Sequence, residues 1–327
     1  MYTPPFSITN EMLSLVSAIS EKVGRLSVTE NMRAKPHLRK NNRIKSVHSS
    51  LKIEANSLSA GQVRDVIDGK AVFGERKEIQ EVKNAYAAYE KLGEINPFDI
   101  NELKAMHRVM TRFLVSEPGR FRSGEEGVFC GERCVFMAPP AKMVPELMQS
   151  LFDWLRQNKG SVHPLIMSSV FHYEFVFIHP FSDGNGRMAR LWHSAFLTKW
   201  NPIFEYIPIE SQIEKFQDEY YNAIAKCHRE GSSNTFILFS LEQINKILDE
   251  FGAQSTAGED ISEYVKKLLG VMDYGVPYTL SSLMELLGLK SKESARRNYI
   301  HPAIKLGLIQ MTISDKPQSR NQRYIKK

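Results

Sequence analysis

One short stretch constrains the fold more than any other, Ile178-His-Pro-Phe-Ser-Asp-Gly-Asn-Gly-Arg-Met-Ala-Arg-Leu-Trp-His193. Apolar residues at helical spacing precede it from Leu165 to Phe177, and Pro180 cannot continue that helix. Gly184-Asn185-Gly186 can adopt positive φ, and a second helix begins at once. The chain must therefore form a helix, a tight loop and another helix, which leaves free backbone N–H groups at one point.

The residues of this stretch suit the binding of an anion beside a metal ion. The N–H groups of residues 184–186 and the positive end of the second helix form an anion nest. Arg187 and Arg190 are three residues apart, so both lie on one face of that helix. Asp183 supplies a hard oxygen ligand for Mg²⁺, and His179 supplies a base that titrates near neutral pH. We therefore predict a phosphate cradle with a metal ligand and a general base.

Three simpler interpretations compete with this one. Asp-Gly pairs often serve as plain helix caps, although two arginines at a helix start oppose the dipole unless an anion is present. Residues 184–189 also match a dinucleotide-binding motif, with Glu205 at a suitable distance, but that motif follows a strand and here a helix precedes. Finally, His179 and Asp183 alone are too few ligands for a transition-metal site.

The remaining chain is predicted to be mainly helical, in three regions. Residues 1–93 form an N-terminal helical extension, residues 94–251 a helical core, and residues 261–327 a C-terminal domain. The core is interrupted by Gly127–Met137, where two short β-prone runs flank a turn and indicate a hairpin. The small, polar segment Phe251–Asp260 is typical of a linker between the last two regions.

Composition excludes several classes of protein. Among 327 residues, 42% are hydrophobic and 24% charged, as in ordinary globular proteins and unlike collagen-like or low-complexity chains. No apolar run approaches the ~20 residues of a membrane span, and the first residues do not resemble a secretory signal. We therefore expect a cytoplasmic protein without membrane contact. Cys130 and Cys134 flank the hairpin turn, where they are able to face each other, and we expect both to be reduced small residues. The alternative is a redox switch between them.

Basic charge is concentrated in the C-terminal region. Residues 261–327 contain 12 Lys and Arg against 5 Asp and Glu, whereas the rest of the chain contains 31 against 32. Two helices are expected over 278–289 and 290–300, followed by two strands within 306–325. This order resembles a winged helix-turn-helix.

Such a domain would place its second helix in the major groove of DNA. The predicted DNA contacts are Lys292, Arg296 and Arg297, with Lys316, Arg320 and Arg323 added by the wing. The alternative is a winged helix that serves as a protein-interaction or homodimer module.

The central stretch resembles the signature of the Fic family, HxFx(D/E)GNGRxxR. It matches at all eight defined positions, namely His179, Phe181, Asp183, Gly184, Asn185, Gly186, Arg187 and Arg190. The similarity extends to Gly119–Arg122, the hairpin and Pro139-Pro140, which look like the family's flap region, and to Asp218–Tyr221, which looks like its nucleotide-pocket helix.

This resemblance implies a protein adenylyltransferase, which moves AMP from ATP to a Ser, Thr or Tyr hydroxyl and releases pyrophosphate. In that mechanism His179 is the base and Asp183 holds Mg²⁺. Gly184, Asn185, Gly186 and Arg187 bind the phosphates, Arg190 pairs with the γ-phosphate, and Tyr221 borders the adenine. The family includes members that use other nucleotides, so ATP is the default. The alternative is a nucleotide-sensing, DNA-binding regulator with little transfer activity.

The family also implies a built-in inhibitor. Ser50-Leu-Lys-Ile-Glu54 fits the inhibitory pattern (S/T)xxxE(G/N), with Ala55 in place of the usual Gly or Asn. Glu54 would form a salt bridge with Arg190 and occupy the place of the γ-phosphate. The alternative is that Ser50 and Glu54 are ordinary surface residues of a helix.

The hairpin is the last feature that the resemblance explains. The family flap docks target segments by strand addition, and the docking strands here would contain Val128, Phe129, Val135 and Phe136. The alternative is a hairpin that only packs on the core.

Overall fold

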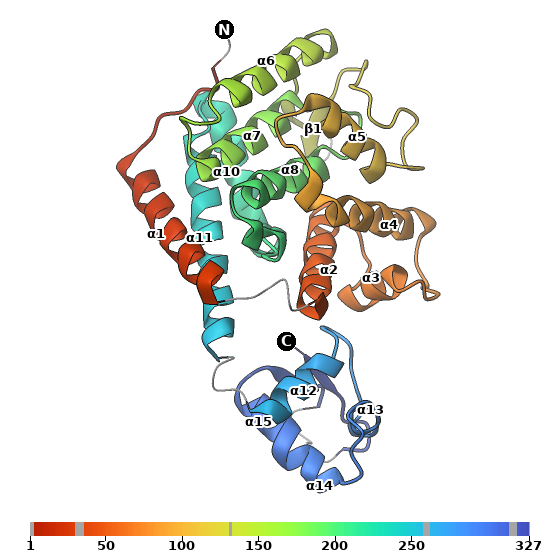
Figure 1. Cartoon of the computed structure of the whole chain (residues 1–327). Helices are drawn as coiled ribbons and strands as arrows, with labels where there is room; N and C mark the ends of the chain where they lie inside the picture. Colours follow the sequence, from red (N-terminus) through yellow and green to blue (C-terminus); the bar gives the residue numbers. More distant parts are fainter. Residues whose placement is uncertain (1–2, 30–35, 131–132, 258–261, 314–318, 327) are drawn as a thin grey trace. The chain divides into compact units, whose positions relative to one another are not determined.

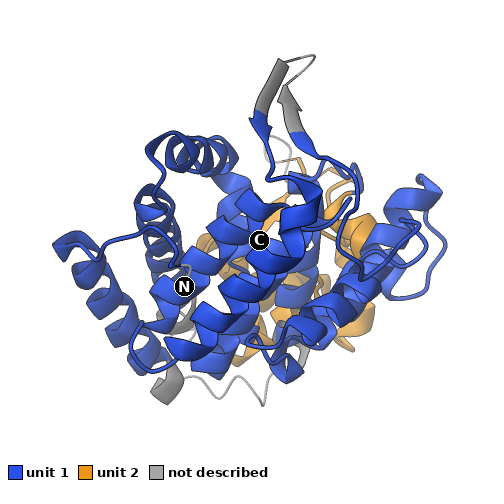
Figure 2. Cartoon of the chain, turned by 90° about the horizontal axis from the view of Figure 1, so that it is seen from above, with its two compact units in different colours: residues 1–58, 65–252 blue, residues 59–64, 253–327 orange. Residues whose placement is uncertain are grey.

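Helices make up most of the computed structural model, as the sequence predicts (Figure 1). The structure describes residues 3–29, 36–130, 133–257, 262–313 and 319–326. They form two compact units, the first of residues 1–58 and 65–252 and the second of residues 59–64 and 253–327 (Figure 2). The finer division into three regions stays a prediction. In the described part of the chain, no helix combines the length and apolar character that a bilayer span requires.

The N-terminal part contains four helices, α1 (Asn10–Thr29), α2 (Pro36–Ile53), α3 (Ala60–Ile67) and α4 (Arg76–Glu90). Helix α2 packs against α4 and against α9 (Glu210–Lys215). Its inner face is partly polar, because Ser46 and Ser50 are buried beside apolar residues. The Ser46 hydroxyl donates to Glu210 at 2.7 Å, and this buried carboxylate also accepts from Tyr89 and Ser194. Hydrogen bonds as well as apolar contacts therefore hold α2 on the core.

Helix α7 (Pro164–Ile178) forms the centre of the first unit, and α8 (Asn185–Trp200) lies beside it (Figure 1). All residues of α7 from Leu165 to Phe175 are buried, so this helix is enclosed by the protein on every side. The surrounding helices are α5 (Ile100–Met110), α6 (Val144–Gln157), α10 (Gln217–Glu230) and α11 (Asn234–Ala257). The predicted linker from Phe251 is wrong in its first part, because α11 continues to Ala257. Residues 253–257 include Ala and Gln and contain neither Pro nor Gly, so nothing in them ends a helix.

The predicted hairpin is present as strands β1 (Gly127–Cys130) and β2 (Arg133–Met137). The strands are antiparallel, and an irregularity between Val128 and Phe129 shifts their register. As a result Cys134 lies opposite Phe129 and Cys130 lies opposite Arg133. The two cysteines are therefore not cross-strand neighbours. The side chains of residues 128–135 lie outside the described part of the structure.

The second unit contains short elements around a small core. Its helices are α12 (Glu263–Val271), α13 (Leu280–Leu286), α14 (Lys292–Ser294), a π-helical segment η5 (Ala295–Ile300) and α15 (His301–Lys305). Strands β3 (Ile309–Met311) and β4 (Tyr324–Lys326) pair antiparallel. Helix α13 is shorter than the predicted 278–289, because Thr279 caps its start and Gly288 takes φ +66° after its end. The winged-helix assignment stays a prediction, and Lys316 lies outside the described residues.

Candidate active site

The loop between α7 and α8 is fixed by two left-handed residues and one amide side chain. His179 ends α7 with φ +52°, and Gly184 precedes α8 with φ +82°. The Asn185 amide is buried, accepts from the Phe181 N–H at 3.0 Å and donates to the Phe181 carbonyl at 2.7 Å. Asn185 therefore clamps the loop with its side chain, which leaves only its backbone N–H for a ligand.

Gly186 has a different role from the one that the sequence suggests. Its φ is not positive, so the expectation of a left-handed turn through Gly184, Asn185 and Gly186 holds only for Gly184. A Cβ atom at Gly186 would lie 2.2 Å from Oε1 of Glu54 and 3.1 Å from Nη1 of Arg190. Gly186 is thus needed because a carboxylate approaches the start of α8 closely.

Arg190 joins the start of α8 to helix α2. Its guanidinium donates from Nη2 to Glu54 Oε1 at 2.7 Å, from Nε to the Ser50 hydroxyl at 3.0 Å and from Nη2 to the Ser50 carbonyl at 2.9 Å. The Arg190 side chain is only 1% exposed, whereas that of Glu54 is 37% exposed. Burial alone would lower the pKa of Arg190, but the Glu54 carboxylate raises it overall. Ser50 and Glu54, far from Arg190 in sequence, therefore hold it in one place as a cation.

The end of α2 has an unusual residue after Glu54. Asn56 N–H donates to the Leu51 carbonyl at 3.1 Å and Ala55 N–H to the Lys52 carbonyl at 3.0 Å, which is the Schellman pattern of helix ends. Ala55 has φ +64°, a conformation that glycine adopts most easily. The helix therefore ends as it would with Gly at this position, and Ala55 bears strain.

Arg187 lies between two carboxylates. Its Nη2 donates to Asp183 Oδ1 at 2.9 Å, and its Nη1 lies 3.5 Å from Glu81 Oε1 on α4. The Asp183 side chain is 44% exposed, and its Oδ1 also accepts from the Gly184 N–H. Nε and Nη1 of Arg187 are buried without a hydrogen-bond partner among the described residues, so they could donate to a phosphate oxygen.

Glu81 is a site residue that sequence reasoning missed. Its Oε2 accepts from the Asn56 amide at 2.8 Å, so Glu81 connects the end of α2 to Arg187. It occurs in a predicted helix with many charged residues and no motif, and nothing in that pattern distinguishes it.

His107 is a second missed residue. Its ring stacks on Phe181 at 3.6 Å, and its Nδ1 accepts from the Gly119 N–H at 2.8 Å. The ring proton must then be on Nε2, which donates to the Asp183 carbonyl at 3.0 Å. Burial lowers the pKa of His107 to about 4, so this neutral form persists at neutral pH. His107 thereby positions the backbone of Asp183.

His179 is fixed through its own backbone. Arg122 is buried and donates from Nε to the His179 carbonyl at 2.7 Å, and its other nitrogens donate to the carbonyls of Gly124 and Pro139. Burial lowers the pKa of the His179 imidazole, which keeps it neutral and able to accept a proton near pH 7. Nδ1 of this ring is buried, which favours Nε2 as the reactive atom.

The other predicted residues belong to other elements of the chain. Tyr221 is 48% exposed on α10, while its neighbour Tyr220 is buried with its hydroxyl 2.9 Å from His172 Nε2. Phe136 of the hairpin stacks on His228 at 4.0 Å, so at least this end of the flap packs on the core. The predicted DNA contacts Lys292, Arg296 and Arg297 belong to the second unit.

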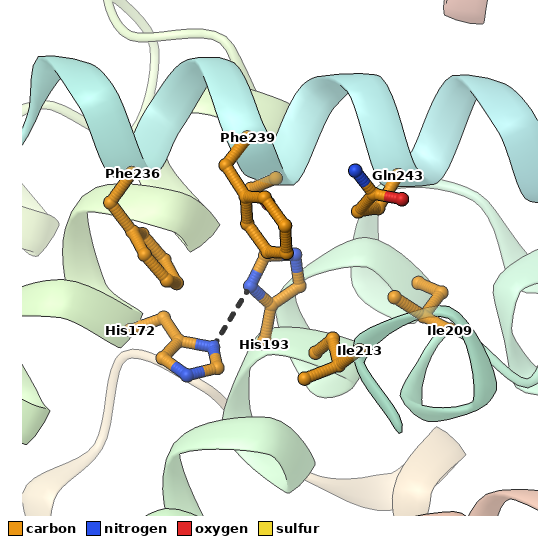
Figure 3. Close-up of a pocket in the computed structure, with 8 residues that line it drawn as sticks. His172, His193, Ile209, Ile213, Phe236, Phe239 and Gln243 are labelled. Atoms are coloured by element: carbon orange, nitrogen blue, oxygen red, sulfur yellow. Dashed lines mark hydrogen bonds between the residues drawn. The ribbon is translucent and has the colours of Figure 1, made fainter. Parts of the chain in front are cut away.

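A buried cavity near His172 is not the active site. It lies between His172, His193 and Gln243, and its volume of about 10 Å³ admits no more than one water molecule (Figure 3). The Nδ1 atoms of the two imidazoles are 3.4 Å apart, and burial lowers the pKa of both rings. The two histidines are therefore neutral core residues.

The residues present fit a magnesium–phosphate ligand better than an isolated metal ion. No group of three or more His, Cys, Asp or Glu suited to a metal occurs among the described residues. Asp183 offers one partly exposed carboxylate, and Mg²⁺ in proteins is often held by one or two carboxylates together with substrate phosphates.

Comparisons with known proteins agree with this geometry. Residues 97–197 match the Fic/DOC family, and residues 263–325 match the family described as "Filamentation induced by cAMP protein Fic-like, C-terminal domain". The crystal structure of a Fic family protein from Desulfovibrio desulfuricans G20 is 40% identical, with a TM-score of 0.74 over 100% of this chain and 98% of that chain. A Fic domain containing signaling protein from Bacteroides thetaiotaomicron VPI-5482 is 22% identical, with a TM-score of 0.62 over 78% and 99%, and shows the fold alone.

Among curated proteins, the protein adenylyltransferase Fic of Nematostella vectensis is 30% identical over 64% of this chain and 49% of its own length. The chain spans about half the length of the curated relatives that it matches.

Proposed function

The chain belongs to the Fic family, and from this premise we propose that it is a protein adenylyltransferase that transfers AMP from ATP to a Ser, Thr or Tyr hydroxyl of another protein. The observation that carries the proposal is the position of the Glu54 carboxylate. It lies against Gly186 and bonds to Arg190, so the start of α8 accommodates an oxyanion beside a buried guanidinium. A γ-phosphate offers the same kind of oxygen atoms to the same donors.

The site residues have distinct roles in the proposed reaction. The backbone N–H groups at Gly184, Asn185 and Gly186, with Arg187, bind the phosphates, and Tyr221 borders the adenine. His179 takes the proton of the attacking hydroxyl at Nε2 while that oxygen bonds to the α-phosphorus. The bond from the α-phosphorus to its bridging oxygen breaks, and pyrophosphate leaves. Mg²⁺ held by Asp183 would neutralise phosphate charge. Most of the catalysis is thus positioning and charge stabilisation.

The same contacts make the enzyme autoinhibited in this proposal. ATP and Glu54 compete for Arg190, and Ser50 holds the guanidinium where Glu54 reaches it. Because Glu54 is partly exposed, solvent weakens its ion pair. We therefore expect its removal to raise transfer by about tenfold, equivalent to about 1.4 kcal/mol. Strands β1 and β2 would dock the target segment beside them.

Incubation with Mg²⁺ and ATP labelled on the α-phosphate tests the proposal. Glu54→Gly should show more covalent label on protein than wild type, while Glu242→Gly, an exposed glutamate on α11, should not. Adding His179→Ala to Glu54→Gly should reduce labelling by at least about 10² while ATP still binds. Asp183→Ala should abolish the Mg²⁺-dependent labelling, because it removes the carboxylate that would hold the metal. Nucleotide binding by Glu54→Gly without any covalent label would favour the alternative, a nucleotide-sensing regulator.

A further inference from the structure

The second unit contains a pocket that the proposed reaction does not use. It has a volume of about 230 Å³ and lies between the start of α13, the stretch α14–η5 and the turn before β4. Three cations line it, Lys292, Arg296 and Arg320. Its polar lining also includes Thr279 and Gln322.

The three cations have no charge partner in the described structure. Within the described ranges, none of them forms an ion pair with a carboxylate. Lys292 and Arg296 are four residues apart on one helical stretch, where like charges repel each other. Arg320 adds a third positive charge from a different part of the chain. An anion in the pocket would relieve this repulsion.

A buried amide in the same pocket needs a hydrogen-bond donor. Gln322 is only 6% exposed, and its Nε2 donates to the Arg323 carbonyl at 2.7 Å. That bond fixes the orientation of the amide, because a carbonyl can accept only from the NH₂ group. Oε1 of Gln322 is then buried and has no partner among the described residues. A bare anion cannot satisfy this atom, whereas an N–H or O–H group can.

The backbone at Arg296 is also unusual. Residues Ala295–Ile300 form a π-helical segment, a rare conformation that is frequent at functional sites. Pro302 has no N–H and cannot donate the bond that a regular α-helix requires at Asn298. The sequence thus builds in the distortion beside the pocket.

We propose that this pocket binds a phosphate group whose carrier also offers a hydrogen-bond donor. Phosphate suits the three cations better than a carboxylate does, because it carries more charge and its oxygens match the paired N–H donors of an arginine guanidinium. The donor for Gln322 would come from the ligand's sugar or base. The phosphate belongs either to a free nucleotide or to a nucleic-acid backbone. The proposal does not depend on AMP transfer in the first unit.

Binding measurements on the full chain test this site. The probes are inorganic phosphate, AMP and a short DNA duplex, each titrated into wild type, the double variant Arg296→Gln/Arg320→Gln and the control Arg297→Gln. Arg297 is an exposed cation on the same segment that does not line the pocket. We expect the double variant to weaken binding of at least one probe by about tenfold or more and the control to change it little. All three sites are exposed, so folding should survive the substitutions.

The pattern of losses identifies the source of the phosphate. A loss for phosphate and AMP alone indicates a free nucleotide, and a loss for the duplex with a smaller salt dependence indicates a nucleic-acid backbone. A third variant, Gln322→Leu, should weaken AMP binding, because leucine cannot accept a hydrogen bond from the sugar or base of the ligand. Equal affinities of the double variant and the Arg297→Gln control for all three probes would overturn the proposal.

Discussion

Replacing Ala55 with glycine should stabilise the protein, although the change removes a methyl group. Ala55 has φ +64° at the end of α2, directly after Glu54. An L-residue with a Cβ atom is strained in this conformation by about 1–2 kcal/mol, and glycine is not. Glycine costs about 0.4–1 kcal/mol through the greater freedom of the unfolded chain. The net gain in the free energy of unfolding is then about 0.5–1 kcal/mol.

A matched control tests whether the gain in the free energy of unfolding comes from the left-handed backbone of Ala55. Ala105 is exposed inside α5, where the backbone is helical, and Ala105→Gly should destabilise the protein by about 1 kcal/mol. The same chemical change is thus expected to act in opposite directions at the two sites, with a difference of roughly 1.5–2 kcal/mol.

Urea unfolding and thermal unfolding both measure this difference. For a unit the size of the first one, 1 kcal/mol corresponds to about 2–4 °C in Tm. Ala55→Gly should raise the urea midpoint without changing the m-value, because no additional surface is exposed. If Ala55→Gly lowers the stability as much as Ala105→Gly does, Ala55 is not strained in its left-handed conformation.

Three further predictions concern the site and its supports. Gly186→Ala should displace Glu54, and in a double-mutant cycle Glu54→Gly should then cost no additional stability; additive losses would contradict the close approach of the carboxylate. Arg122→Lys should lower stability by about 3 kcal/mol, because lysine cannot serve the several buried carbonyls around Arg122; an unchanged urea midpoint would refute this role. His107 and His193 have pKa values of about 4 and about 3 when folded, so each should lower the free energy of unfolding by about 2 kcal/mol between pH 6.5 and pH 5, and the loss should continue toward the folded pKa; stability that is flat over this range would refute their neutrality.

Sequence periodicity predicted the fold where local signals were strong. The mainly helical class, the hairpin and the loop between α7 and α8 are confirmed, because Pro180, the glycines and the apolar spacing determine them locally. The end of α11 was placed too early, since polar residues occur in linkers and in exposed helix turns alike. The register of β1 and β2 could not be foreseen, because it depends on an irregularity that composition does not encode.

The candidate site was predictable only as far as its motif extends. The resemblance implied the contact of Glu54 with Arg190, and the structure contains that contact. Glu81 contacts Asn56 with one carboxylate oxygen and Arg187 with the other, and His107 donates from Nε2 to the Asp183 carbonyl. Both contacts depend on how α4 and α5 pack on the loop. Such contacts join residues far apart in the chain, and a single sequence carries no record of that proximity.

The requirement for a residue without a side chain at position 186 also limits how this protein can evolve. Under the proposed mechanism, the inhibitory carboxylate and the nucleotide use the same small space beside α8. A substitution that fills this space excludes both the Glu54 carboxylate and the nucleotide, so no substitution of Gly186 yields an active enzyme without inhibition. Gain-of-function alleles must instead arise at Ser50 in α2 or at Glu54 directly after it. Substitutions that abolish activity and substitutions that abolish inhibition therefore fall at different positions. Regulation can then change between lineages while the catalytic motif stays unchanged.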